Sequence, residues 1–93
     1  MKKWFIIRRI VGGSMLPRLI PGQIVLGLPS SRLRIGDVVI LAHGGLEKIK
    51  RIDRIDGDLV YVLGDNAEAS TDSRQFGCIN RADILARVVW PRA

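Results

Sequence analysis

The sequence contains one cysteine and one histidine. Cys78 alone can form neither an internal disulfide nor a multi-cysteine metal site, and His43 alone cannot supply a zinc motif built on paired histidines. His43 lies in the run Ala42-His43-Gly44-Gly45, which predicts a solvated turn residue. We therefore expect neither a metal nor a cofactor that belongs to this protein.

Long hydrophobic runs are also missing. The two longest apolar runs, Val38–Ala42 and Leu59–Leu63, are short, whereas a membrane-spanning helix needs about 20 apolar residues. The apolar segment Trp4–Ile7 is shorter than the ~7–15 apolar residues of a secretory signal peptide. We expect no membrane span and no signal peptide, and a cytoplasmic location with peripheral membrane association as the alternative.

Acidic residues are few, with nine Asp and Glu against 15 Lys and Arg, which gives a formal net charge of +6. Such a surplus attracts polyanions and anionic lipid, but the basic residues are scattered. The one cluster surrounds an apolar segment near the N-terminus and consists of Lys2, Lys3, Trp4, Phe5, Arg8 and Arg9. This cluster predicts either a solvated edge strand or a weak contact with an anionic membrane surface.

Aromatic residues make up 5% of the chain and do not alternate with basic residues along a strand, as they would in a base-stacking platform. We therefore expect no nucleic-acid partner. A basic β module that binds nucleic acid or an anionic surface without catalysis is the non-enzymatic alternative.

Short segments rich in Ile, Val and Leu, separated by turn residues, predict a β protein. The expected strands are residues 5–11, 23–28, 37–42, 46–55, 59–63 and 88–90. Gly44-Gly45 and Asp56-Gly57 predict tight turns. One helical turn is expected over Met15–Ile20 and a short helix over Arg81–Ala86. The expected fold is mainly β, a compact antiparallel sheet or partly open barrel with one or two short helices, in a single domain over residues 1–93.

Two polar stretches interrupt the β pattern, and each also fits an ordinary surface loop. In Gly12–Pro17, glycines before a serine allow close backbone approach, and free N–H groups there can stabilise an oxyanion. In Gly64–Arg74, an Asp72–Arg74 ion pair would hold a scaffold loop.

Between these stretches, Lys48 and Lys50 share one face of an expected strand. Burial would lower the pKa of a lysine and make it a base near neutral pH. A serine–lysine dyad is therefore the hydrolytic chemistry that these residues support best.

Four sequence boxes resemble those of the type I signal peptidase superfamily. They are Ser14–Pro17, Arg34–Val39, Lys50-Arg51 with Gly57-Asp58, and Gly64-Asp65-Asn66 followed by Ser70, Asp72-Ser73-Arg74 and Phe76-Gly77. They occur in the order of the family and cover residues 12–77. The resemblance implies a minimal signal-peptidase-like catalytic domain and a serine endopeptidase.

The resemblance also implies a role for each matching residue. Ser14 would be the nucleophile, and its backbone N–H would donate to the oxyanion. Lys50 would be the general base, and Ser70 would orient it. Lys50 is preferred to Lys48 because only Lys50 is followed by an arginine and only Lys50 has the correct distance to Gly57-Asp58. The residues that would support the site are Gly64, Asp65, Asn66, Asp72 and Arg74.

Gly12 departs from the family pattern, because many members carry a hydroxyl residue two positions before the nucleophile. The loss of one oxyanion donor can lower turnover by ~10²–10³. An inactive relative that binds leaders without cutting them is therefore one alternative. Arg18, Gln23 and Ile35 also depart from the pattern, outside the chemical steps.

The small size and the run Gly64–Gly77 most resemble the nickel-type superoxide dismutase maturation peptidases. The resemblance implies a precursor polypeptide as substrate, bound extended against strand edges, from which an N-terminal leader is removed; the nickel would belong to that substrate. A signal peptidase I-like enzyme that cleaves secretory signal peptides at the membrane surface is the alternative. Self-cleaving regulators of the SOS-repressor type are disfavoured, because the chain has no room for a DNA-binding segment.

Overall fold

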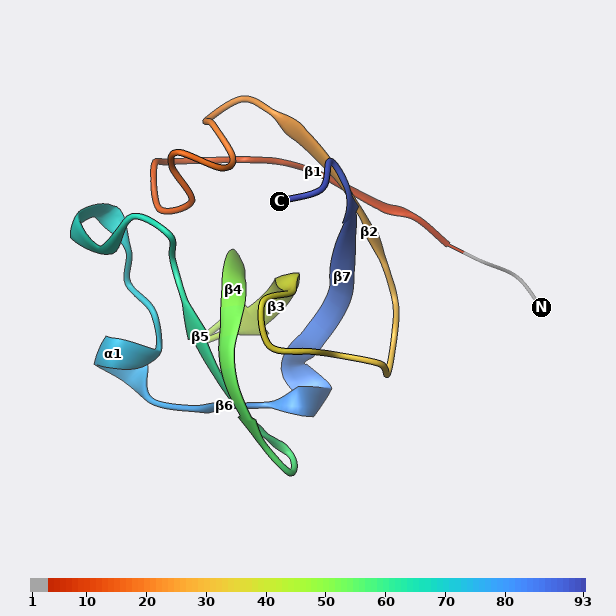
Figure 1. Ribbon diagram of the computed structural model, residues 1–93, viewed down its shortest axis with the longest axis vertical. Coiled ribbons are helices and arrows are strands. Elements are labelled where there is room, and N and C mark those ends of the chain that lie inside the picture. Colours follow the sequence, from red (N-terminus) through yellow and green to blue (C-terminus); the bar gives the residue numbers. More distant parts are fainter. Residues whose placement is uncertain (1–3) are drawn as a thin grey trace.

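The computed structural model describes residues 4–93, which form one open sheet of seven antiparallel strands. The strands are β1 (Ile6–Arg9), β2 (Ile24–Leu28), β3 (Val38–His43), β4 (Leu46–Asp56), β5 (Leu59–Leu63), β6 (Ile79–Asn80) and β7 (Ile84–Trp90). Their order in the sheet is β1-β2-β7-β3-β4-β5-β6, and Figure 1 shows how the sheet curves. The expected antiparallel, mainly β fold is confirmed. Lys2 and Lys3 of the basic cluster lie outside the described residues.

Both predicted turns join neighbouring strands of the sheet. Gly44 and Gly45 have positive φ angles of 60° and 79° and connect β3 to β4. Gly57, with a φ angle of 59°, connects β4 to β5. Glycine adopts these left-handed conformations without the strain that a side chain would add.

The helical elements differ from the expectation. The helix expected over Arg81–Ala86 is a single 3₁₀ turn, η2 (Arg81–Asp83), followed at once by β7. Ala86 pairs with Ile40 of β3, so sheet pairing overrides the local helical pattern. Met15–Ile20 forms a turn with one helical hydrogen bond, from Leu19 N–H to the Met15 carbonyl, at 3.0 Å.

Two short elements were missed in the polar loop before β6. The 3₁₀ turn η1 (Ala67–Ala69) leads to the four-residue helix α1 (Ser73–Phe76). Asp72 and Gln75 form a capping box at the start of α1. The spacing of these two residues was the sequence signal that could have predicted this helix.

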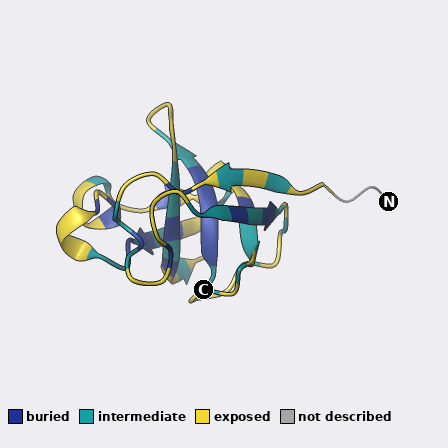
Figure 2. Ribbon diagram, turned by 90° about the horizontal axis from the view of Figure 1, so that it is seen from above, coloured by how far each residue is buried: buried dark blue, intermediate teal, exposed yellow. Residues whose placement is uncertain are grey.

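Two buried clusters form the core. The first combines β3, β4, β5 and β6 through Val39, Leu41, Ile52, Val60, Val62 and Ile79. The second combines Ile10, Met15, Leu19, Val25 and Val38. Figure 2 shows buried positions along the strands and exposed ones in most connecting loops. Met15 and Leu19 are exceptions, because they anchor the loop after β1 in the core. None of the helices within residues 4–93 is long and apolar enough to cross a bilayer.

Candidate active site

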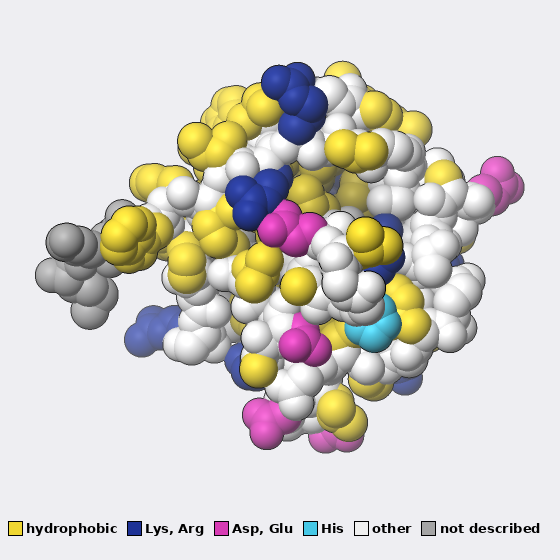
Figure 3. All heavy atoms as spheres, turned by 180° about the vertical axis from the view of Figure 1, so that it is seen from behind, with side chains coloured by type: hydrophobic (Ala, Val, Ile, Leu, Met, Phe, Trp, Pro, Cys, Tyr) yellow, Lys and Arg dark blue, Asp and Glu magenta, His cyan; other side chains and the backbone are white. Residues whose placement is uncertain are grey.

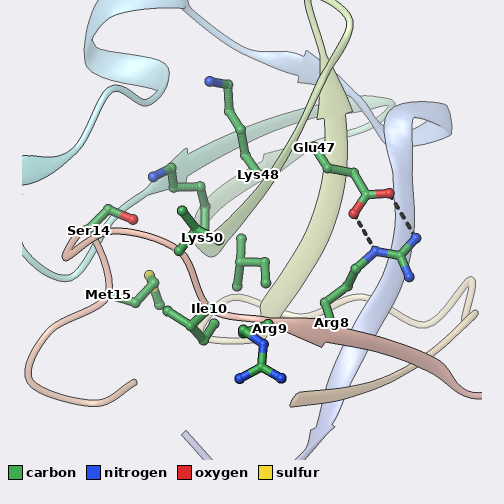
Figure 4. A pocket seen from close by; sticks show the side chains of 10 residues that line it. Arg8, Arg9, Ile10, Ser14, Met15, Glu47, Lys48 and Lys50 are labelled. Carbon is green, nitrogen blue, oxygen red and sulfur yellow. Dashed lines mark hydrogen bonds and ion pairs between the residues drawn. The ribbon is translucent and has the colours of Figure 1, made fainter. Parts of the chain in front are cut away.

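A pocket of about 370 Å³ lies between β1 with its following loop and the first half of β4, a volume within the usual range for ligand sites. The lining residues are Arg8, Arg9, Ile10, Val11, Ser14, Met15, Glu47, Lys48, Ile49 and Lys50. Figure 4 shows the hydroxyl of Ser14 and the amine of Lys50 on the same side of this pocket, reached from the loop and from β4 respectively. The structure thus brings together two residues that are far apart in the sequence.

Ser14 is positioned by contacts of its neighbours and of its own backbone. The adjacent Met15 is 1% exposed and fixes the loop in the second core cluster. From the other side, Asn66 donates its backbone N–H to the Ser14 carbonyl at 2.8 Å and its side-chain amide to the Gly13 carbonyl at 3.0 Å. These contacts hold the loop through its backbone, so the Ser14 hydroxyl is not needed to maintain it.

Lys50 is buried on β4, at 5% exposure, where it pairs with Val39 of β3. Burial lowers the pKa of its amine. The Asp72 carboxylate opposes this shift, whereas the charges of Lys48 and Arg74 add to it. The net lowering favours the neutral amine, which is the form that can accept a proton from a hydroxyl.

Asp72 is the centre of a buried hydrogen-bond network. It accepts from the Ser70 hydroxyl at 2.6 Å, from the Gly64 N–H at 2.8 Å and from Arg74 Nη2 at 2.6 Å. Burial alone would raise the pKa of the Asp72 carboxyl, but hydrogen bonds from Arg74, Ser70 and Gly64 outweigh it and hold this pKa well below its usual range. Asp72 is therefore ionised and fixed in place.

Ser70 uses its hydroxyl proton for the bond to Asp72. The resemblance implied that Ser70 orients Lys50 by a hydrogen bond. With its proton committed to Asp72, the Ser70 oxygen has lone pairs that can accept from an amine. An orienting contact with Lys50 would thus use Ser70 as the acceptor.

Gly64 lies where the serine loop and the Ser70 loop meet. A Cβ atom at this position would lie 2.2 Å from the Ser70 hydroxyl oxygen and 2.8 Å from the Ser14 carbonyl oxygen. Because β4 and β5 are antiparallel, Gly64, one residue beyond β5, lies at the level of Lys50 on the neighbouring strand. Glycine is therefore required for the close packing around the pocket.

Asp65 connects the same loop to the strand that carries Lys50. Its carboxylate accepts two hydrogen bonds from Arg51, at 2.9 and 2.8 Å. Arg51 also donates to the backbone carbonyls of Gly36 at 2.8 Å and Ala93 at 3.0 Å. The sequence places Arg51 in the lysine box without indicating a role for it. In the structure, its bidentate bond to Asp65 links β4 to the loop.

Gly12 provides no side-chain donor for an oxyanion. Its φ angle is 74°, and a Cβ atom there would have no neighbour within 4 Å. A serine at this position would therefore have space but a strained backbone. The backbone N–H of Ser14 stays the expected oxyanion donor.

His43 is not the solvated turn residue that the sequence predicted. It ends β3, is half-buried, and stacks on Phe76 of α1 with ring centroids 4.2 Å apart. The error arose because the turn consists of the two following glycines alone. Within residues 4–93, no group of three or more His, Cys, Asp or Glu residues is placed to hold a metal ion.

Comparison with known families assigns the class. Residues 42–92, more than half of the chain, match the family described as signal peptidase, peptidase S26. The chain belongs to this family, and the match supports a serine peptidase of the signal-peptidase type. The matched range includes Lys50 and the loop that holds Ser70 and Asp72, and it begins after Ser14. No match to a curated protein sequence was found.

Proposed function

We propose that this protein is a serine endopeptidase that uses Ser14 and Lys50 to remove an N-terminal leader from a precursor protein. The observation that carries the proposal is the placement of the Ser14 hydroxyl and the buried Lys50 amine in one pocket. Family membership supports the reaction class. The finer roles of both residues follow from their chemistry.

The chemistry proceeds in two steps. The Ser14 oxygen attacks the scissile carbonyl while neutral Lys50 takes the hydroxyl proton, and the resulting Lys50 ammonium donates that proton to the departing amine. Lys50 then deprotonates a water molecule that attacks the acyl-Ser14 ester, and the Lys50 ammonium returns this proton to the departing Ser14 oxygen, which releases the second product and restores Ser14 and neutral Lys50. The Ser14 backbone N–H would stabilise the oxyanion in both steps.

The substrate would bind as an extended chain. β1 forms one edge of the sheet, and residues 8–11 of β1 and the loop after it line the pocket. An extended peptide can hydrogen-bond to the main chain of such an edge without strict sequence demands. The single domain of residues 1–93 would therefore supply both the dyad and the docking edge.

A nickel-type superoxide dismutase proform is the proposed precursor. The support for this finer assignment is the resemblance of the run Gly64–Gly77 and the small size of the chain. The nickel would be bound by the product of cleavage, and no nickel chemistry is required of the peptidase.

The proposal is tested by mass spectrometry of this proform after incubation with the wild-type chain and its variants. We expect wild type to shorten the proform at its N-terminus, and Ser14→Ala and Lys50→Met each to lower the cleavage rate by at least about 10³-fold. Ser31→Ala, which changes an exposed serine outside the pocket, is the matched control and should cut like wild type. Cleavage at the wild-type rate by either Ser14→Ala or Lys50→Met would contradict the proposed Ser14–Lys50 dyad.

A second candidate, cleavage of secretory signal peptides at an anionic membrane surface, is favoured by one surface feature. Trp4, Phe5, Ile7 and Trp90 are all more than half exposed. Ile7 pairs with Leu26, which in turn pairs with Trp90, so part of this apolar surface crosses β1, β2 and β7. Figure 3 shows hydrophobic side chains near the end of the chain drawn in grey.

Arg8 belongs to the cluster that the sequence assigned to this surface, and its side chain points to a partner in the pocket. It is ion-paired to Glu47 in the pocket, whereas Arg9 is exposed. Co-sedimentation with phosphatidylserine-containing vesicles at moderate salt tests the second candidate, with neutral phosphatidylcholine vesicles as control. Binding to the anionic vesicles that is lost in Trp4→Ser/Phe5→Ser would support it, and absence of binding would contradict it.

A further inference from the structure

Lys48 lies two residues before Lys50 on β4 and lines the same pocket. Its side chain is half-buried, and its Nζ lies 5.8 Å from the ring centroid of Phe76, which itself stacks on His43. The ion pairs within residues 4–93 are made by Arg8, Arg51, Arg54 and Arg74. Lys48 is thus held at the pocket by an aromatic ring, without a carboxylate partner among the described residues.

The charge of the pocket lining is unbalanced. Arg8, Arg9, Lys48 and Lys50 contribute basic groups, and Glu47 is the acidic residue among them. Both carboxylate oxygens of Glu47 accept hydrogen bonds from Arg8, at 2.5 and 2.9 Å, as the dashed lines in Figure 4 show. The acid and one base of the lining therefore neutralise each other, and the positive charge of Lys48 is available to a ligand.

We propose that Lys48 binds an acidic side chain of the polypeptide substrate while Ser14 and Lys50 act on a peptide bond nearby. This inference rests on the proposed peptidase function. Residues two apart on a strand are separated by about 6.6 Å, and the same spacing separates alternate residues of an extended substrate. The Asp or Glu would therefore lie about two residues from the scissile bond.

The geometry of Lys48 fits a specificity role better than a structural one. Lys48 and Phe76 are both half-buried, and of the two only Lys48 lines the pocket, while Phe76 packs against the first core cluster. An incoming carboxylate would gain a charge-assisted hydrogen bond in a partly dehydrated pocket, where such bonds are stronger than at an open surface. A lysine at the same substrate position would be repelled.

The test uses alanine-rich peptides of twelve residues that carry one Asp at each position in turn, with Asn and Lys counterparts. Their binding to the Ser14→Ala variant is measured by fluorescence anisotropy at low salt. At one or two positions we expect the Asp peptide to bind about fivefold more tightly than the Asn peptide. This preference should disappear in Ser14→Ala/Lys48→Met and shift toward the Lys peptide in Ser14→Ala/Lys48→Glu. Ser14→Ala/Arg32→Met, which removes an exposed cation outside the pocket, should keep it.

Equal binding of the Asp and Asn peptides at every position, or a preference that survives in Ser14→Ala/Lys48→Met, would overturn the Lys48 inference. Cleavage by wild type separates this result from a failure of the proposed function. Ser14-dependent cleavage without a preference for acidic peptides would contradict the role of Lys48 in substrate specificity and would support the proposed peptidase function. If binding depends on Lys48 but wild type cleaves no peptide and no proform, the acidic binding site is supported and the proposed peptidase function is contradicted.

Discussion

The backbone carbonyl of Ser14 accepts a hydrogen bond of 2.8 Å from the backbone N–H of Asn66. This bond joins the loop after β1 to the loop after β5, and Gly64 packs at the same junction. The two halves of the candidate site are therefore held by main-chain contacts and not by the side chains proposed for catalysis. Variants of the Ser14 hydroxyl should consequently fold like the wild type.

We expect Lys50→Met to abolish cleavage and to raise the free energy of unfolding at neutral pH. A buried amine with a lowered pKa resists protonation in the folded state, while in the unfolded chain it is protonated up to about pH 10.4. Between the lowered pKa and about pH 10.4 the unfolded state binds more protons, so the stability of wild type rises with pH across this window.

Urea unfolding at several pH values measures this effect. The Met variant should lack the part of the rise that Lys50 causes, and Arg32→Met, at an exposed position, should retain it. A Lys50→Met protein whose stability rises with pH as steeply as that of wild type would show that Lys50 has no lowered pKa, which contradicts a buried amine that favours its neutral form.

Gly64→Ala should destabilise the fold by about 1–3 kcal/mol and reduce cleavage, because the added methyl group would overlap the Ser70 hydroxyl and the Ser14 carbonyl. Gly13→Ala is the matched comparison, since its methyl group would meet a flexible Leu16 side chain at 3.1 Å. Chemical denaturation of both variants gives the measurement. A loss for Gly64→Ala no larger than for Gly13→Ala would contradict the close packing at Gly64.

The pKa of Asp72 predicts how the protein responds to acid. Because that pKa is held well below its usual range, the carboxylate contributes stability that is fully present above the unfolded value of about 3.9 and is lost as the pH falls through the folded pKa. Asp72→Asn should lose this part of the acid dependence and be less stable at pH 7 by about 2 kcal/mol or more. Unfolding curves from pH 7 to pH 2 test this, with exposed Glu68→Gln as control; an unchanged acid profile in Asp72→Asn would contradict it.

The pH dependence of cleavage reports on the proposed base. We expect kcat/KM to rise with pH through the pKa of Lys50, below the pH at which an ordinary lysine titrates, because burial lowers that pKa. Lys48 and Arg74 lower it further and Asp72 opposes them; Arg8, Arg9 and Glu47 also line the pocket. Lys48→Met removes one positive charge and should move the rise to higher pH. A profile that is flat, or that Lys48→Met moves to lower pH, would contradict the assignment of Lys50 as base.

The fold was largely predictable because local pattern and sheet pairing agree along most of the chain. Apolar runs such as Leu59–Leu63 became strands, and the glycine turns close the expected hairpins. The prediction failed over Ile84–Ala86, where an Asn cap suggested a helix but the chain pairs with β3. That pairing depends on residues some forty positions away, which a local pattern does not contain.

The site was predicted less completely. Spacing within the family boxes identified Ser14 and Lys50. Strand alternation, however, places Lys48 and Lys50 on the same face and does not say which of them is buried. Only the three-dimensional fold shows that Lys50 is buried and Lys48 is half-buried. The Asn66–Ser14 bond and the close approach at Gly64 are contacts between distant segments. Such contacts depend on how the sheet curves, and residue types in sequence do not specify that curvature.

Catalysis by the proposed dyad requires a neutral Lys50 amine within proton-transfer reach of the Ser14 hydroxyl. The most direct measurement is an NMR titration of the Lys50 ¹³Cε resonance in wild type and in Ser14→Ala, assigned with Lys50→Met. We predict a pKa below the ordinary value of about 10.4 and a resonance that changes when the Ser14 hydroxyl is removed. A Lys50 that titrates near 10.4 or above, with a resonance insensitive to Ser14→Ala, would contradict the dyad.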